Sequence, residues 1–178
     1  MKIKAELMDE EAVSRTMLRL THEILEKNHG TEKLAIVGIR NRGDCLARRI
    51  IRSIQEIDKK TVPFGELDIT LYRDDFQKLN EQPVLRETNI PFDVTDLKIV
   101  LVDDVLYTGR TIRSAMDALM DLGRPALIQL AVLIDRGHRE LPIKADYVGK
   151  NIPTAPAEQV QVLLKETDGV DRVNLIQT

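Results

Sequence analysis

The residues of this chain best suited to chemistry are two adjacent carboxylates, Asp103 and Asp104. They follow a continuous apolar run at 99–102, which is typical of a strand buried on both faces and predicts that the strand ends at the acids. A short turn and the sequence Thr-Gly-Arg-Thr at 108–111 then lead into a helical pattern. Backbone N–H groups of such a loop and a helix N-terminus attract phosphate, and carboxylates bind sugar hydroxyls or Mg²⁺. The segment therefore predicts a site for a phosphorylated ligand.

The acid pair also has a purely structural explanation, because acids at the end of a strand can cap the following turn. Adjacent carboxylates repel one another, however, and a cation or a hydroxyl ligand relieves that repulsion. The ligand-binding interpretation is therefore favoured. The sequence has neither the Gly-x-x-x-x-Gly-Lys-Ser/Thr pattern of a Walker phosphate loop nor the Gly-x-Gly-x-x-Gly pattern of a dinucleotide site, which excludes both classes.

Hydrophobic periodicity predicts strands that alternate with helices. Asp9 begins the first helix and Gly30 ends it, while Gly123 and Pro125 close a helix that starts near Ile112. The other predicted elements are a strand at 34–37, a loop at 38–43, a helix at 44–54, a strand at 66–72, a long polar loop at 73–92, strands at 98–102, 127–134 and 145–148, a loop at 135–139, and a hairpin joining 159–166 to 170–176 through Thr167-Asp168-Gly169.

This alternation predicts an α/β fold with a mostly parallel, twisted sheet flanked by helices and an antiparallel addition near the C-terminus. Ligands of such sheets bind outside the carboxyl ends of the strands. The loops at 38–43, 103–111 and 135–139 each follow a predicted strand, so we expect them to meet at one site. The loop at 73–92 is unusually long for a compact domain, which favours a functional role.

Composition indicates a globular protein with one domain at 1–178. Hydrophobic residues make up 43% and charged residues 31%, both ordinary values. The net charge of −3 argues against a dedicated nucleic-acid protein, although not against a local basic face. The single cysteine, Cys45, excludes an internal disulfide and a cysteine-rich zinc site. No apolar run approaches the roughly 20 residues that cross a membrane, and the N-terminus is charged, so we expect a cytoplasmic protein without membrane contact.

The stretch from the acid pair to Thr111 closely resembles the phosphoribosyl-pyrophosphate (PRPP) signature of type I phosphoribosyltransferases. The resemblance implies that fold, with a small hood and a C-terminal β-hairpin. It also implies that Asp103 and Asp104 meet the ribose hydroxyls, directly or through Mg²⁺, and that the following loop wraps the 5′-phosphate. The residues it implies for binding PRPP or the product UMP are Gly38, Ile39, Arg40, Arg73, Asp103, Asp104, Val105, Leu106, Tyr107, Thr108, Gly109, Arg110 and Thr111.

Two further loops resemble parts of the same family's site. The sequence 38–40 matches the pyrophosphate loop, which often contains a non-proline cis peptide, and Arg40 would contact the pyrophosphate. The segment 72–75 resembles the start of the flexible catalytic loop, in which Arg73 would bind the leaving pyrophosphate. A solvated turn is the alternative for Arg40, and a plain surface loop is the alternative for Arg73. The resemblance thus implies four catalytic residues, which are Asp103, Asp104, Arg40 and Arg73.

The type of base is indicated by Tyr107 and by three longer segments. Purine phosphoribosyltransferases of this superfamily place an Asp where Tyr107 stands, and a phenol is a poor base at neutral pH. The segments 68–75, 135–142 and 146–153 resemble the family of bifunctional pyrimidine operon regulators and uracil phosphoribosyltransferases, over nearly the whole chain. This implies that uracil and PRPP give UMP and diphosphate. It also implies that uracil is held, partly through backbone groups, by Asp135 and Arg136; a turn cap is the alternative for Asp135.

The same resemblance implies a regulatory activity. The family binds the leader of pyrimidine operon messenger RNA when UMP or UTP is bound, and so favours transcription termination. The implied RNA-binding residues are Arg19, His22, His138, Arg139, Lys144 and Lys150, for which solvated surface charges are the alternative. Leu18 departs from the small polar residue that the family often has there. Homodimers or larger homo-oligomers are also implied.

Four interpretations of function are open at this stage. The first is an enzyme that makes UMP from uracil and also regulates through RNA. The second is an RNA-binding attenuator with negligible catalysis, and the third is a uracil phosphoribosyltransferase that has lost RNA binding. The fourth is a purine or orotate phosphoribosyltransferase, which Tyr107 and the 135–142 segment disfavour. The presence of Arg40, Arg73 and the acid pair favours retained chemistry.

Overall fold

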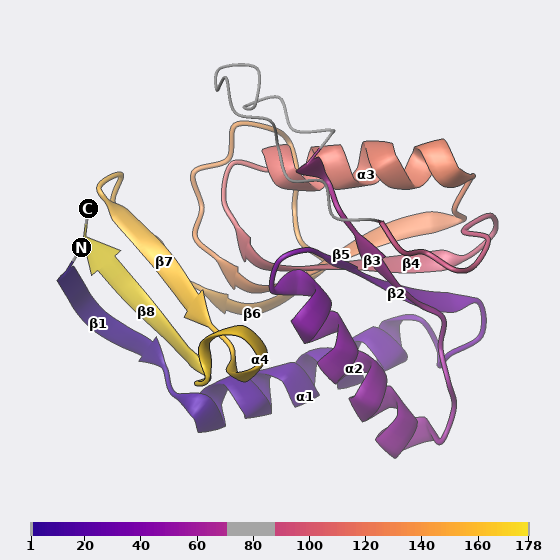
Figure 1. Cartoon of the computed structure of the whole chain (residues 1–178), viewed down its shortest axis with the longest axis horizontal. Helices are drawn as coiled ribbons and strands as arrows, with labels where there is room; N and C mark the ends of the chain where they lie inside the picture. Colours follow the sequence, from indigo (N-terminus) through magenta and orange to yellow (C-terminus); the bar gives the residue numbers. More distant parts are fainter. Residues whose placement is uncertain (1, 71–87, 178) are drawn as a thin grey trace.

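The computed structural model describes residues 2–70 and 88–177, which form two β-sheets (Figure 1). In these residues the larger sheet has five strands in the order β3-β2-β4-β5-β6, and every neighbouring pair is parallel. The strands are β2 (Leu34–Ile39), β3 (Phe64–Leu67), β4 (Lys98–Leu106), β5 (Leu127–Asp135) and β6 (Tyr147–Asn151). The predicted α/β architecture with a parallel sheet is confirmed.

Helices cover both faces of the larger sheet (Figure 1). They are α1 (Glu10–Lys27) and α2 (Gly43–Asp58) on one face and α3 (Arg110–Leu122) on the other. In β4, Val100 and Val102 join the apolar cluster under α1 and α2, whereas Ile99 and Leu101 join the cluster under α3. Burial on both faces therefore explains the continuous apolar run. Across residues 2–70 and 88–177, no helix combines the length and the apolar character needed to cross a bilayer.

The order of the strands along the chain opens a crevice between β2 and β4. From β2 the chain crosses to β3 on one side and later to β4 on the other, with α2 and α3 on opposite faces. The loops that leave β2 and β4 therefore diverge, and ligands of parallel sheets bind at such a switch point. β4 also extends beyond β2, because its pairing with β2 ends at Val102 opposite Gly38, whereas its pairing with β5 continues to Leu106 opposite Asp135.

Several predicted strand boundaries are wrong, and two of them by four or more residues. The strand predicted at 98–102 continues through the acid pair to Leu106, because it remains paired with β5. The strand predicted at 66–72 is β3, which ends at Leu67, where its pairing with β2 ends. Asp68 then accepts hydrogen bonds from the backbone N and the hydroxyl of Thr70, which turns the chain out of the sheet.

The loop predicted at 73–92 is described only over 88–92. There Asn89 forms an isolated antiparallel bridge with Glu66, through N···O hydrogen bonds of 2.8 Å in each direction. Residues 73–87, Arg73 among them, lie outside the described residues.

Both ends of α1 follow the predicted signals. Asp9 accepts a hydrogen bond from the backbone N of Ala12 (2.8 Å) and so caps the N-terminus of the helix. Beyond the last turn, the backbone N of Gly30 donates to the carbonyl oxygen of Leu25 (2.9 Å). These contacts fix the length of the helix whose apolar stripe faces the sheet.

The smaller sheet joins the two ends of the chain (Figure 1). It is antiparallel, in the order β1-β8-β7, with α4 between β7 and β8. Its elements are β1 (Lys2–Met8), β7 (Glu158–Leu163), α4 (Lys165–Asp168) and β8 (Arg172–Gln177). The predicted hairpin is confirmed, although a short helical turn precedes Gly169 at its tip. β1 was not predicted, because most of its residues are exposed and bury little apolar surface.

The smaller sheet is anchored to α2 by the guanidinium of Arg49. This group donates to both carboxylate oxygens of Asp171 (2.9 and 2.7 Å) and to both of Glu166 (2.8 and 2.6 Å). Burial alone would raise the pKa of Asp171, but the hydrogen bonds from Arg49 and from the backbone N of Lys165 make the net shift downward. The Arg49 hydrogen bond likewise lowers the pKa of Glu166.

We predict that Arg49→Met destabilises the fold by about 3 kcal/mol at pH 7, because it leaves a buried carboxylate unpaired. The pair stabilises the fold above the ordinary Asp pKa of about 4, and that contribution is lost as pH falls through the lowered folded-state value. The deficit of the variant should therefore shrink towards pH 3 in urea unfolding. Arg172→Met, which removes an exposed pair with Glu6, is the control and should cost less than about 1 kcal/mol. Equal losses of stability in both variants would show that Arg49 does not anchor the smaller sheet to α2.

Candidate active site at the carboxyl ends of β2, β4 and β5

The acid pair lies in β4 at the edge of the crevice. Asp103 is buried, and one of its carboxylate oxygens accepts a hydrogen bond from the backbone N of Asp104 (2.9 Å). Asp104 in turn accepts one from the backbone N of Val105 (2.7 Å). Burial raises the pKa of Asp104, and the Val105 hydrogen bond and the charge of Arg42 offset part of this rise. A carboxylate in this environment gains stability from a cation or a hydroxyl donor.

Gly43, the first residue of α2, allows the β2 loop to approach the acids. A Cβ atom at this position would lie 2.5 Å from the carbonyl oxygen of Val102 and 3.1 Å from the Cα of Asp103. Any side chain would therefore push α2 away from β4. The close approach fixes the width of the crevice where the two loops diverge.

The loop behind the acids forms a cavity of about 340 Å³ with the first turn of α3. Gly109 precedes the helix with a φ of +93°, and the backbone N of Arg110 donates to the hydroxyl of Thr108 (3.3 Å). The cavity is lined by residues 105–112, Ser114 and Glu140. A helix N-terminus at the wall of a cavity provides N–H donors and a positive partial charge, so this cavity suits a phosphate group.

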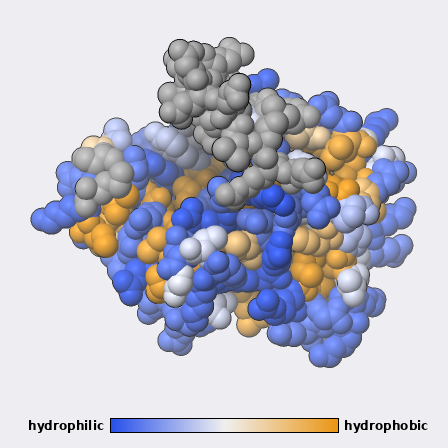
Figure 2. All heavy atoms as spheres, in the orientation of Figure 1, coloured by the Kyte–Doolittle hydropathy of each residue, from blue (hydrophilic) through white to orange (hydrophobic). Residues whose placement is uncertain are grey.

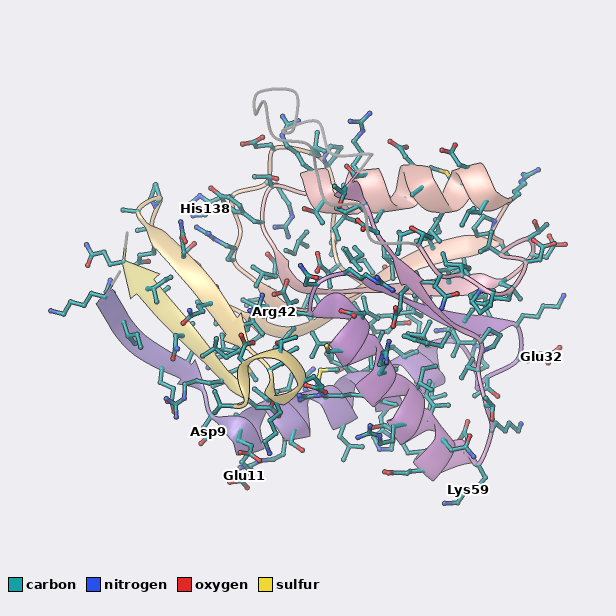
Figure 3. The ribbon with its side chains drawn as sticks, viewed as in Figure 1. Asp9, Glu11, Glu32, Arg42, Lys59 and His138 are labelled. Carbon is teal, nitrogen blue, oxygen red and sulfur yellow. The ribbon has the colours of Figure 1, made fainter. Side chains whose placement is uncertain are left out.

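The β2 loop provides two arginines on the other side of the crevice. The peptide bond between Arg40 and Asn41 is cis, as the resemblance implied. The Arg40 guanidinium pairs with Glu66 at 2.5 Å, and its side chain is only 23% exposed, unlike a solvated turn. Arg42 pairs with Asp168 of α4 at 3.1 Å, which links this loop to the smaller sheet. Figure 3 shows Arg42 at the start of α2, and Figure 2 shows hydrophilic residues at the centre of the same face.

The loop after β5 closes the third side of the site. One carboxylate oxygen of Asp135 accepts from the backbone N of Gly137 (3.0 Å), as in the turn-cap alternative. The other accepts from Arg139 (2.5 Å), which also donates to the carbonyl oxygens of Tyr107 (3.0 Å) and Ile143 (2.8 Å). Asp135 therefore positions its own loop, and Arg139 ties that loop to the phosphate cavity.

The ring of Tyr107 stacks on the guanidinium of Arg136. The guanidinium of Arg136 is centred 4.0 Å from the Tyr107 ring and is held from behind by the Thr154 hydroxyl (3.2 Å) and the Glu158 carbonyl oxygen (2.7 Å). The His138 ring meets the Tyr107 ring edge-on, with centroids 6.2 Å apart. Together Tyr107, Arg136 and His138 form a rigid, partly apolar surface next to the β4 loop, of the kind on which a planar base stacks.

The residues predicted for RNA binding fall into separate groups. Arg19 donates to the carbonyl oxygen of Gly149 (2.6 Å), so it lies beside Lys150, which donates to the carbonyl oxygen of Leu7 (3.0 Å). His22 and Lys144 are exposed. By contrast, the ring of His138 is hydrogen-bonded to the carbonyl oxygen of Thr154, and Figure 3 places His138 on the side of the smaller sheet. The guanidinium of Arg139 donates to carbonyl oxygens of neighbouring loops.

Three acidic residues of the site were not predicted. Each pairs with an arginine of one of the loops, and in every pair the partners are at least 26 positions apart in the sequence, so no local motif reveals them. Of the three acids, only Glu66 could have been noticed in the sequence, because it is an acid within a buried strand. The pairs are Arg40–Glu66 (2.5 Å), Arg110–Glu140 (2.7 Å) and Arg42–Asp168 (3.1 Å).

Comparison with known proteins gives strong similarities. The phosphoribosyl transferase domain family matches residues 5–167. "Bifunctional protein PyrR" of Thermus thermophilus is 61% identical over 175 residues, covering 98% of this chain and 97% of that protein. "Bifunctional protein PyrR" of Pelotomaculum thermopropionicum is 59% identical with the same coverage.

Solved structures with the same fold are more distant in sequence. A hypoxanthine-guanine phosphoribosyltransferase from Bacillus anthracis has a TM-score of 0.74 at 19% identity, covering 99% of each chain. A hypoxanthine phosphoribosyltransferase from Trypanosoma cruzi has a TM-score of 0.76 at 17% identity, covering 98% of this chain and 96% of that one. At such identities the likeness concerns the fold alone, and it confirms the predicted type I phosphoribosyltransferase fold.

We predict that Gly43→Ala destabilises the protein by about 1–3 kcal/mol, because the new methyl group overlaps the β4 backbone. Urea unfolding measures this loss. Glu56→Ala, on an exposed position of the same helix, is the control and should change stability by less than about 0.5 kcal/mol. A Gly43→Ala variant as stable as the native protein would show that α2 does not rest on β4 in solution.

Proposed function

We propose that this protein converts uracil and PRPP to UMP and diphosphate. The chain belongs to the phosphoribosyl transferase domain family and, within it, to the bifunctional PyrR proteins, and this membership supports the proposal. The observation that carries the proposal is the acid pair of β4, with an anion cavity on one side and Arg40 on the other. PRPP has this same order of groups, a 5′-phosphate, a ribose with two hydroxyls, and a diphosphate.

The three parts of the crevice bind the three parts of PRPP in this proposal. The loop at 105–111 and the first turn of α3 take the 5′-phosphate. Asp103 and Asp104 take the ribose hydroxyls, and Arg40 takes the diphosphate. Arg73, outside the described residues, keeps its proposed part in binding the leaving diphosphate.

Asp103 and Asp104 would also hold Mg²⁺, directly or through water and ribose hydroxyls, and the ion would neutralise negative charge on the diphosphate. Within 2–70 and 88–177, no group of three or more His, Cys, Asp or Glu side chains could hold a metal by themselves. Two carboxylates would fill only part of the coordination sphere of Mg²⁺. The remaining positions suit oxygen ligands from the substrate with which the ion arrives.

The chemistry requires little more than positioning and charge stabilisation. The bond between the anomeric carbon and the diphosphate oxygen breaks, the bond to N1 of uracil forms, and the N1 proton is released to solvent, which gives UMP, diphosphate and one proton. Positive charge develops on the sugar while negative charge develops on the leaving group, where Arg40 stabilises it. The loops hold ribose and base in line for the transfer.

Uracil is recognised, in this proposal, mainly by shape and backbone groups of the loop after β5. The Asp135 carboxylate is occupied by Gly137 and Arg139, so it orders the loop and leaves the neighbouring backbone to contact the base. The base would stack near Tyr107, which Arg136 supports. Tyr107 also lacks the carboxylate that a purine-directed Asp would supply at this position.

The experiment that tests this function compares bases. We predict that the protein with Mg²⁺ and PRPP forms UMP from uracil and forms no nucleotide at a comparable rate from hypoxanthine or orotate. Asp104→Asn should lower kcat/KM for uracil by about 100-fold or more, because the acid pair loses a charge that holds the ribose and its ion. Asp117→Asn, on an exposed i,i+4 pair of α3, is the matched control and should remain active. Faster turnover of hypoxanthine, or an active Asp104→Asn, would contradict the proposal.

We also propose a regulatory function, in which the nucleotide-bound form binds the leader of pyrimidine operon messenger RNA in the cytoplasm, with UMP or UTP as effector, as a homodimer or larger homo-oligomer. The observation in favour is the pair of cations formed by Arg19 and Lys150, which come from different elements onto one face of α1 and β6. The alternatives are an attenuator with negligible catalysis and an enzyme without RNA binding.

We predict that Arg19→Ala weakens binding of a pyrimidine leader hairpin about tenfold in the presence of UMP and lowers the salt dependence by about one ion. Turnover of uracil should stay unchanged, because Arg19 lies on α1, away from the crevice. Arg113→Ala, from an i,i+4 pair on α3, is the control with the same change of charge. Equal affinity for an unrelated hairpin would refute the RNA function while leaving the enzyme intact.

A further inference from the structure

Glu66 is a buried acid that the proposed chemistry does not use. It lies on β3 opposite Gly38 of β2, and its side chain is only 7% exposed. A buried carboxylate is costly unless it is paired and hydrogen-bonded. Here two guanidinium groups meet it, Arg40 from the β2 loop at 2.5 Å and Arg48 from α2.

The Glu66 residue is fixed on both sides of its strand. β3 pairs with β2 through the register Gly38 to Glu66, and the backbone N and O of Glu66 are hydrogen-bonded to Asn89 at 2.8 Å. The carboxylate is therefore held by backbone that has little freedom to move, and it offers Arg40 a fixed anchor.

Arg40 is held to this strand end at two points. Its backbone N donates to the carbonyl oxygen of Leu67 (3.0 Å), and one terminal nitrogen of its guanidinium pairs with Glu66. Its Nε is buried and has no hydrogen-bond partner among the residues that the structure describes. The guanidinium is thus held along the side that carries Nε and the Glu66 pair, so an anion would meet its other terminal nitrogen.

The cluster formed by Glu66, Arg40 and Arg48 has a net positive charge. Glu66 contributes one negative charge, and the two arginines contribute two positive charges. Arg48 is 58% exposed and stacks 5.4 Å from the Phe64 ring, so it faces solvent rather than the acid pair. Arg48 offsets the charge of Glu66, and the positive charge of Arg40 is then retained for a ligand.

We propose that Glu66 is a positioning residue, which orients the Arg40 guanidinium towards the diphosphate part of the substrate while Arg48 balances the buried charge. This inference rests on the proposed function, since it assigns the anion that Arg40 meets. Removing Glu66 has two opposite effects: it frees the Arg40 side chain, and it makes the loop more positive. The proposal holds that the loss of orientation outweighs the gain in attraction.

The test is calorimetric binding of inorganic diphosphate with Mg²⁺, and of UMP, to the native protein, Glu66→Gln, Arg40→Ala and the double variant. We expect Glu66→Gln to weaken diphosphate binding about tenfold, and the double variant to bind no more weakly than Arg40→Ala, because both residues act through one guanidinium. UMP affinity, which depends on the opposite loop, should change less than about twofold. In kinetics, KM should rise for PRPP and not for uracil.

Two further variants guard against a loss of folding. Arg48→Gln removes a half-exposed cation, leaves Glu66 to neutralise Arg40, and should weaken diphosphate binding without unfolding the protein. Asp146→Asn removes a carboxylate that pairs with Lys27 (3.1 Å) and accepts from the backbone N of Leu130 (2.8 Å), at the other end of the sheet, and should leave diphosphate binding unchanged.

The possible results distinguish a failure of the proposed role of Glu66 from a failure of the proposed enzyme function. A native protein that binds neither diphosphate nor UMP would refute the proposed function. A native protein that binds both, with Glu66→Gln binding diphosphate equally or more tightly, would overturn the role of Glu66. So would unchanged diphosphate binding by Arg48→Gln, or a double variant with the full losses of both single variants.

Discussion

The structure depends on one topological constraint, the divergence of the chain at the carboxyl ends of β2 and β4. These neighbouring parallel strands send their helices to opposite faces of the sheet, so the backbone leaves a crevice that no side chain has to create. The extension of β4 past β2 places Asp103 and Asp104 on the wall of that crevice while β5 still supports them. Gly43 then sets how closely the opposite loop approaches.

The parts of this arrangement that the sequence predicted are those encoded by neighbouring residues. The apolar run of β4, the acid pair and the loop at 108–111 are contiguous, and the cap at Asp9 acts within one helical turn. The position of the strand end was not predictable in this way. It depends on whether β5, a strand distant in the sequence, offers a partner beyond Val102.

The supporting charges were missed for the same reason. Arg40 was identified from its loop, but Glu66 is 26 positions away and reaches it only because β3 pairs with β2. The same dependence on tertiary pairing holds for Arg139. The sequence predicts an RNA-binding cation, and in the fold its guanidinium bonds Asp135 and two carbonyl oxygens, so it orders the loop next to the base surface. Residue type indicates charge, and only tertiary pairing determines what the charge does.

Two buried acids, Asp171 and Glu66, are both paired with arginine, with different consequences. Asp171 meets Arg49, which also pairs with Glu166, so two carboxylates outnumber one guanidinium and the join between α2 and the smaller sheet has no positive charge left for a ligand. Glu66 meets two guanidinium groups and leaves one positive charge in excess. A protein that needs only an anchor has no reason to keep uncompensated charge in a half-buried loop, because desolvation makes it costly. The excess positive charge at the carboxyl end of β2 is therefore the charge that the proposed diphosphate would neutralise.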